Sequence, residues 1–193
     1  MRDQARIVIM KGKLMTHLDN ILPPGFIDYL EGITIVRPYE KGRTILSPGN
    51  LGNKAWLIRK GAAKMFNYDS RGKQHISYLF SEGEIMLCIN SFFAGQAADA
   101  YIVLLEDCEL MAVTKDQLVN GYPDREPIGD LQKSILLEYI RKMELKVELL
   151  TLPAKERYQM FRNLYKRAGL LVNDLSSYLH LDRSYLSVIM NNA

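Results

Sequence analysis

The chain has 193 residues, 48% of them hydrophobic and 24% charged, which is ordinary for a globular protein of one large or two small domains. No apolar run reaches about 18 residues, and the run at residues 7–10 is too short for a secretory signal peptide, which excludes a membrane-spanning protein and predicts a cytoplasmic one. Residues 131–193 carry ten Lys or Arg against six Asp or Glu, which indicates an anionic partner there, although a solvated mixed surface explains this charge equally well.

The first predicted elements are short helices around residues 15–30, broken at Pro23-Pro24, followed by strands across residues 32–114. Glycines recur there at spacings of 7, 12, 11 and 11: Gly42, Gly49, Gly61, Gly72 and Gly83. Strands are expected at residues 44–46, 55–58, 64–68, 75–79, 101–105 and 109–113. Short strands with a turn residue every 8–12 positions predict an antiparallel sandwich or barrel. Residues 69–72 have the composition of a hairpin turn.

A long helix is predicted at residues 128–150, which no proline or glycine interrupts after Gly129. Apolar residues follow at alternating steps of four and three: Leu136, Ile140, Met143, Val147 and Leu150. So narrow a seam usually faces another helix, and it predicts a dimer interface along a helix of about 34 Å. The alternative is an amphipathic helix packed on its own barrel.

The remaining residues predict a helix and then a helix-turn-helix. Pro153 ends the long helix, and residues 154–166 form the next one, with Gly169 after its end. Asn173 or Asp174 is expected to cap a helix at residues 175–179. A tight turn at residues 180–182 leads to a second helix, residues 183–190, capped by Asp182. Five apolar residues have the spacing to pack the two helices together: Leu175, Leu179, Leu181, Leu186 and Ile189.

This arrangement is typical of a DNA reader, in which the second helix enters the major groove. The expected base-facing residues are Arg183, Ser184, Tyr185, Ser187 and Val188. The expected phosphate contacts are Lys155, Arg157, Arg162, Lys166 and Arg167. A small helical hairpin without DNA contacts is the alternative.

Nothing in the chain predicts a metal, a cofactor or an enzyme. Cys88 and Cys108 are too few for an iron–sulfur cluster or a four-cysteine zinc site, and we expect two buried thiols. His17, His75 and His180 stand singly, without ligand spacing. No nucleophile with its base and no phosphate-binding loop is present in the sequence.

In combination these features resemble the cyclic AMP receptor protein / fumarate–nitrate regulator superfamily, and most closely its members common in Bacteroidetes. The residues that carry the resemblance are the glycine ladder, residues 83–85 before Ser91-Phe92, residues 105–110, the long helix, and residues 156–158 and 175–187. The resemblance implies an α+β fold with three parts. These are a cyclic-nucleotide-binding-like β-roll (a double-stranded β-helix or jelly roll) at residues 1–127, a dimerisation helix at 128–150, and a winged helix-turn-helix at 151–193. It also implies a homodimer, with double-stranded DNA, RNA polymerase and a small-molecule effector as partners.

The effector cleft departs from the family pattern. Cyclic AMP-responsive members present Gly-Glu to the ribose and Arg-Ser or Arg-Thr to the cyclic phosphate. Counting along the strands makes Gly83 a turn glycine and places those positions at Leu87-Cys88 and Ala98-Asp99. Alanine lacks the cation that a phosphate needs, and aspartate repels it. We therefore expect no cyclic AMP in the usual mode. The predicted cleft residues are Leu87, Cys88, Ala98, Asp99 and Met143.

The recognition helix departs as well. Arg183 keeps one base-contacting arginine of the family, Val188 replaces a second, and His180 stands where the turn usually has glycine. The first hypothesis is a dimeric DNA-binding transcription regulator. The second, which Val188 favours, is a sensor or adaptor with the same fold that does not bind DNA.

Overall fold

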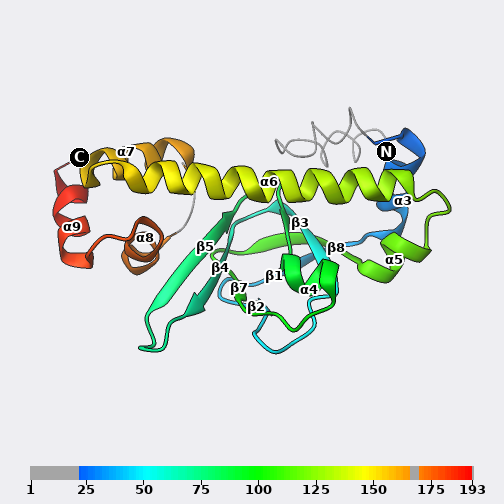
Figure 1. The fold of residues 1–193 in the computed structure, drawn as a ribbon, viewed down its shortest axis with the longest axis horizontal. Coiled ribbons are helices and arrows are strands. Elements are labelled where there is room, and N and C mark those ends of the chain that lie inside the picture. Colours follow the sequence, from blue (N-terminus) through cyan, green and yellow to red (C-terminus); the bar gives the residue numbers. More distant parts are fainter. Residues whose placement is uncertain (1–21, 166–169, 193) are drawn as a thin grey trace.

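A computed structural model describes residues 22–165 and 170–192, which form a two-sheet β-roll, a long helix and a helical group at the far end of that helix (Figure 1). The strands are β1 Val36–Tyr39, β2 Thr44–Leu46, β3 Lys54–Lys60, β4 Ala63–Tyr68, β5 Gln74–Phe80, β6 Ile85–Met86, β7 Tyr101–Leu104 and β8 Cys108–Thr114. The helices are α3 Pro24–Ile33, α4 Ile89–Ala94, α5 Lys115–Asn120, α6 Glu126–Thr151, α7 Ala154–Leu164, α8 Val172–Leu179 and α9 Arg183–Asn191. Within the described residues no helix is long and apolar enough to cross a membrane.

The β-roll consists of two antiparallel four-stranded sheets. One has the order β1-β8-β3-β6 and the other β2-β7-β4-β5. All five glycines of the predicted ladder have positive φ, between 75° and 104°. Gly72 closes the β4–β5 hairpin, where its amide donates to the Asp69 carbonyl at 2.9 Å. The predicted antiparallel barrel and its hairpin turn are therefore confirmed.

Several elements differ from the sequence expectations. Helix α3 begins at Pro24, at the predicted break between the short helices, because proline fits the first turn of a helix, but it continues to Ile33. Strands β1 and β6 and helices α4 and α5 were not predicted; the strands are only four and two residues long. The predicted helical residues before Leu22 lie outside the described part of the chain.

Helix α6 has two apolar faces. One face packs on the β-roll through Ile128, Leu131, Ile135 and Tyr139, all of which are buried. The predicted heptad seam lies on another face. Of its members, Leu136, Ile140, Met143 and Val147 are exposed and Leu150 is half-buried. The two alternatives for this helix are thus compatible, since it covers its own barrel and still leaves the seam open.

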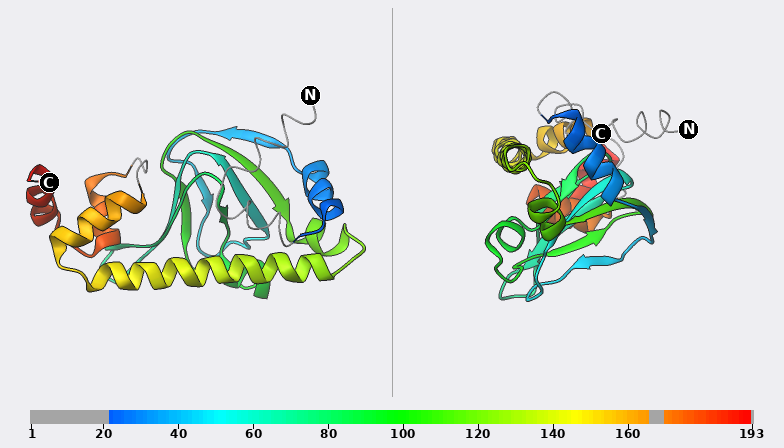
Figure 2. Two further views of the ribbon diagram at one scale, coloured as in Figure 1. Left: turned by 90° about the horizontal axis from the view of Figure 1, so that it is seen from above. Right: turned by 90° about the vertical axis from the view of Figure 1, so that its right-hand side faces the viewer.

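The C-terminal helices share a core with the outer surface of the β-roll. Leu149, Tyr158, Phe161, Tyr178 and Leu179 form one buried cluster with side chains of β4 and β5. Viewed from above, α7, α8 and α9 lie at the end of α6, and the β4–β5 hairpin extends toward them (Figure 2). The described residues of this group are helical, so the wing that the resemblance implies is not among them.

The start of the helix-turn-helix needs a correction. Helix α8 begins at Val172, three residues before its predicted start, and its N-cap is Leu171, without a side-chain cap. Neither Asn173 nor Asp174 caps it. Asp174 is buried and forms an ion pair with Lys64, so a tertiary contact and not the helix end determines its place.

Candidate nucleic-acid interface and effector cleft

Helices α8 and α9 form a helix-turn-helix around a left-handed residue. His180 has φ 51° and ψ 43°, the single positive φ of a non-glycine residue in the described chain. The Asp182 carboxylate accepts hydrogen bonds from the amides of Ser184 and Tyr185, at 2.8 and 3.1 Å, and so caps α9 as predicted. Leu179 and Leu186 are fully buried between the two helices.

The outer face of α9 carries the predicted base-facing residues. Arg183 and Ser184 are exposed, and Tyr185 and Val188 are each more than half exposed. Ser187 is half-buried, and its hydroxyl donates to the Arg183 carbonyl at 2.9 Å. Arg183 forms no ion pair with any residue that the structure describes. The structure therefore brings these five side chains onto one accessible surface, which is what a reading helix needs.

The predicted phosphate contacts do not all lie on that surface. Lys155 and Arg162 are exposed on α7. Lys166 and Arg167 lie outside the described residues.

Arg157 has another role than the predicted one. Its guanidinium makes four hydrogen bonds, to the carbonyls of Leu150, Leu152 (two) and Leu179, at 2.7–3.2 Å. These carbonyls lie at the C-terminal ends of α6 and α8, where no following backbone amide of the helix donates a hydrogen bond to them. Arg157 thus joins the end of α6 to the helix-turn-helix, and four of its five N–H donors are not free for DNA.

His180 makes the turn sensitive to acid. Burial lowers its pKa below 6.5, and the positive charges of Lys146, His75, Arg157 and Lys73 lower it further. The unfolded chain therefore binds the proton more readily, and the free energy of unfolding falls as the pH drops through and below 6.5.

We expect His180→Asn to reduce the loss of stability between pH 7 and pH 5, because asparagine tolerates the left-handed conformation but does not titrate. Urea denaturation at both pH values measures this. An equal loss in both proteins would exclude His180 as the acid-sensitive group.

The predicted effector-cleft residues are brought together, with one exception. Leu87 and Cys88 precede α4, and the Cys88 thiol lies 3.6 Å from the Asp99 carboxylate. Ala98 is buried beside them. Gly83 is the turn glycine between β5 and β6, as the count along the strands predicted. Met143 is the exception, because it is 45% exposed on the open face of α6.

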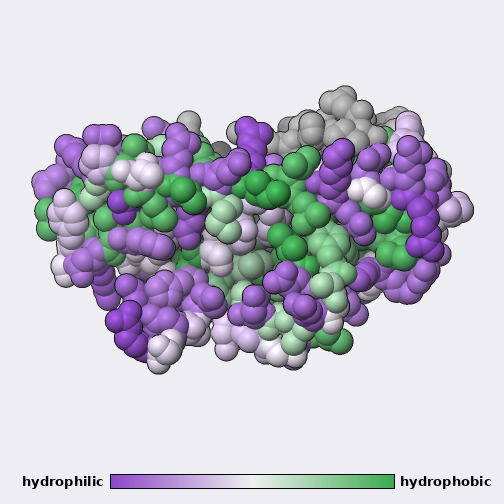
Figure 3. All heavy atoms as spheres, viewed as in Figure 1, coloured by the Kyte–Doolittle hydropathy of each residue, from purple (hydrophilic) through white to green (hydrophobic). Residues whose placement is uncertain are grey.

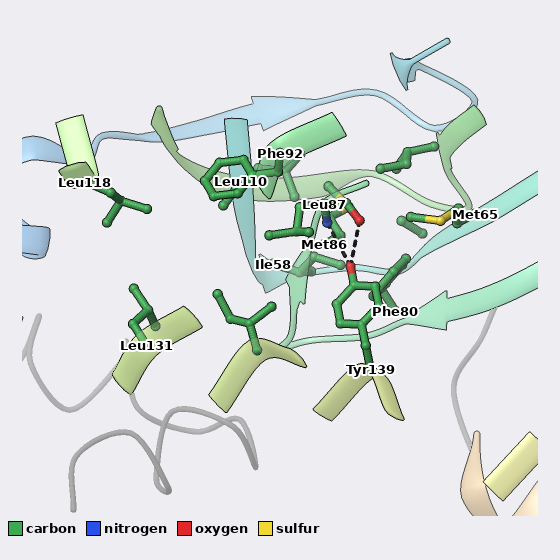
Figure 4. Close-up of a cluster of buried hydrophobic side chains, with 14 of the residues drawn as sticks. Ile58, Met65, Phe80, Met86, Leu87, Phe92, Leu110, Leu118, Leu131 and Tyr139 are labelled. Atoms are coloured by element: carbon green, nitrogen blue, oxygen red, sulfur yellow. Dashed lines mark hydrogen bonds between the residues drawn. The ribbon is translucent and has the colours of Figure 1, made fainter. Parts of the chain in front are cut away.

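The side chain of Tyr139 lies in the buried cluster beside Leu87 and forms hydrogen bonds with the Leu87 backbone (Figure 4). Its hydroxyl donates to the Leu87 carbonyl at 2.8 Å and accepts from the Leu87 amide at 2.9 Å. Its ring lies against Tyr78 and Phe80, with centroids 4.9 and 5.8 Å away. Burial raises the pKa of the Tyr139 hydroxyl, so it remains protonated and can donate.

Two lysines continue this attachment of α6. Lys142 is buried, and its ammonium donates to the Leu79 carbonyl and to the Glu84 carboxylate at 2.9 and 2.8 Å. Lys146 donates to the Ile76 carbonyl and lies over the Tyr178 ring at 4.8 Å. Burial lowers the pKa of Lys146 to about 8. Three successive turns of α6 are thus bound to the β-roll.

Polar contacts also hold α8 to the edge strand β5. The Ser177 hydroxyl donates to the Gln74 carbonyl at 2.7 Å and accepts from the Ile76 amide at 3.1 Å. Asp174 pairs with Lys64 and accepts a hydrogen bond from the Gln74 amide at 3.2 Å. The position of α8, and of α9 packed on it, relative to the β-roll therefore depends on these side chains.

Sequence reasoning missed the roles of Tyr139, Lys142, Arg157 and Asp174. A signal for Tyr139 was present, because Leu131, Ile135, Tyr139 and Lys142 follow steps of four, four and three along a second stripe of α6. Contacts made by Arg157 and Asp174 to distant backbone and side chains have no such local signal.

The chain thus consists of a β-roll joined by a long helix to a helix-turn-helix. The comparisons with known proteins agree. The cyclic nucleotide-binding domain family matches residues 36–122. The cyclic AMP receptor protein of Thermus thermophilus is 24% identical over 142 residues, which is 74% of this chain and 64% of the relative. The match therefore spans less than two thirds of that relative's length.

Solved structures share the fold. FixK2 of Bradyrhizobium japonicum is 16% identical, with 83% of this chain and 84% of FixK2 covered and a TM-score of 0.72. The c-di-GMP responsive regulator CLP of Xanthomonas campestris is 14% identical, with 88% and 91% covered and a TM-score of 0.69. Residues 36–122 thus match the cyclic nucleotide-binding domain family, and the chain as a whole shares its fold with these two solved structures.

Proposed function

We propose that this protein is a homodimeric DNA-binding transcription regulator whose β-roll does not take cyclic AMP in the usual mode. The observation that carries the proposal is the exposed outer face of α9. Arg183 is the first residue of this helix, the Asp182 side chain caps it, and the left-handed residue His180 precedes it. The proposed parts are the β-roll at residues 1–127, the helix at 128–150 and the reader at 151–193. Its proposed partner at promoters is RNA polymerase. Its proposed location is the cytoplasm.

The exposed seam of α6 supports the homodimer. Ile140, Met143 and Val147 are each about half exposed, and hydrophobic side chains recur along α6 on the face of the molecule seen in Figure 3. A row of apolar residues at heptad spacing in water costs free energy unless a second helix covers it. A second copy of α6 has the matching seam, which a twofold axis would bring face to face.

The cleft supports a sensor that does not respond to cyclic AMP. Ala98 and Asp99 offer no cation to a cyclic phosphate, and Asp99 carries the same sign of charge. The Tyr139 hydroxyl forms hydrogen bonds with the amide and the carbonyl of Leu87, and its ring fills the space beside Phe80. A nucleotide would have to displace this ring and leave the Leu87 amide and carbonyl to be satisfied again.

Fluorescence anisotropy with labelled duplexes tests the proposal. We expect salt-sensitive binding of the full chain and enrichment, from a random pool, of two half-sites about one helical turn or a multiple of it apart. Arg183→Ala should weaken binding to the enriched site by about 1–3 kcal/mol and relax its sequence preference. Glu156→Ala, on the exposed surface of α7, is the control for a nonspecific effect.

No salt-sensitive binding from a folded dimer would contradict the proposal. It would favour the second candidate, an adaptor without DNA contacts. The observation behind that candidate is Val188, which places an exposed apolar side chain where a base-reading helix gains from a donor.

A further inference from the structure

A groove of about 240 Å3 crosses one face of the β1-β8-β3 sheet. Its floor is formed by Leu110 and Ala112 of the central strand β8. Arg37 of β1 stands opposite Leu110, and Trp56 of β3 stands opposite Ala112. Lys54, two residues before Trp56 on the same face of β3, completes the second wall.

Two aromatic rings line this groove. The rings of Tyr39 and Trp56 meet edge to face, with centroids 5.8 Å apart at 88°. Both are half-buried, so part of each ring contacts solvent. Beside them Ile35 is 68% exposed. A planar ring bound here would contact these apolar surfaces and remove them from water.

Two cations stand on opposite walls. Arg37 and Lys54 are exposed, and neither forms an ion pair with a residue that the structure describes. The Lys54 ammonium lies over the Trp56 ring, 5.6 Å from its centroid, so the cation and the ring adjoin one another. None of the residues described as lining the groove is acidic. Strands lie about 4.8 Å apart, so β1 and β3 are about 10 Å apart, and both long side chains can reach one anion between them.

A third polar group faces the same groove. The side-chain oxygen of Gln117 accepts from the amide and the hydroxyl of Thr114, both at 2.9 Å. This fixes the amide orientation and leaves the Gln117 nitrogen as a donor. The groove thus offers a ligand two cations, Arg37 and Lys54, and the neutral amide donor of Gln117.

We propose that this groove binds a small aromatic carboxylate, with its ring on Trp56 and Tyr39 and its carboxylate between Arg37 and Lys54. The volume fits one ring with a short acidic group. The cations select an anion over its neutral amide, and the rings select an aromatic acid over an aliphatic one. None of the residues that line the groove is among the predicted effector-cleft residues, and the proposal does not depend on DNA binding.

Trp56 is the sole tryptophan of the chain, so its emission reports directly on the groove. The full-length protein is titrated with benzoate, benzamide and acetate while Trp56 emission is recorded, and calorimetry detects any binding that leaves the emission unchanged. We expect saturable binding of benzoate, and at least about tenfold weaker binding of both other compounds.

The variants locate the site. Arg37→Gln and Lys54→Gln should each weaken benzoate binding by about tenfold or more. Lys60→Gln removes an equal charge from the exposed end of the same strand, outside the groove, and should leave binding unchanged. Absence of benzoate binding by both methods, equal binding of benzamide, or equal loss in Lys60→Gln would overturn the proposal.

Discussion

Replacing Tyr139 with alanine is expected to lower the free energy of unfolding by about 3–5 kcal/mol, the range for removing a buried aromatic ring. Tyr139 is 3% exposed and packs on Tyr78 and Phe80. Its loss opens a cavity and also leaves the amide and carbonyl of Leu87 without their partner. Urea denaturation at fixed protein concentration measures the change. Glu144→Ala, exposed on the same helix, is the control and should change stability by less than about 0.5 kcal/mol.

Two further measurements separate the ring from the hydroxyl. Tyr139→Phe keeps the packing and should cost only about 1–3 kcal/mol, the penalty for an unsatisfied buried polar group. Phenol has the shape and the hydroxyl of the missing side chain, so it should raise the thermal midpoint of Tyr139→Ala and leave the wild type unchanged. A Tyr139→Ala protein as stable as the wild type, with no response to phenol, would show that the ring does not fill the space beside Phe80.

Of the two stripes along α6, only the heptad seam was predicted from the sequence. The heptad seam is strictly apolar, so its spacing alone predicts it. The packing stripe contains a tyrosine and a lysine, whose burial depends on the Leu87 backbone and on Glu84. Polar side chains are buried only when a partner is present, and that partner lies more than 50 residues away in the chain. A pattern within one helix therefore cannot identify them.

Local rules succeeded where the chain needs a special conformation. Glycine spacing located the turns of the β-roll, because each of those positions has positive φ. Asp182 was correctly predicted to cap α9, since its carboxylate contacts amides only two and three residues away. Asp174 was misassigned by the same rule. Its type suits a cap, but a lysine 110 residues earlier binds the carboxylate.

Asp174→Ala is expected to destabilise the protein by about 3–5 kcal/mol, because it leaves Lys64 as an uncompensated charge in a site where its side chain is only 13% exposed. Asp28→Ala, an exposed aspartate on α3, is the matched control and should have little effect. The double variant Lys64→Met/Asp174→Leu should recover most of the loss, since apolar residues of similar volume can replace a buried pair.

The same change should loosen the helix-turn-helix, because Asp174 and Ser177 together hold α8 to β5. The Ile76 amide donates to Ser177, so its hydrogen exchange reports on this contact without requiring global unfolding. We expect faster exchange at Ile76 in Asp174→Ala, and unchanged exchange at Leu87, whose amide is bound by Tyr139. Equal acceleration at both amides would instead mean that α8 and the β-roll open as one cooperative unit, in which case the helix-turn-helix could not move independently of the β-roll.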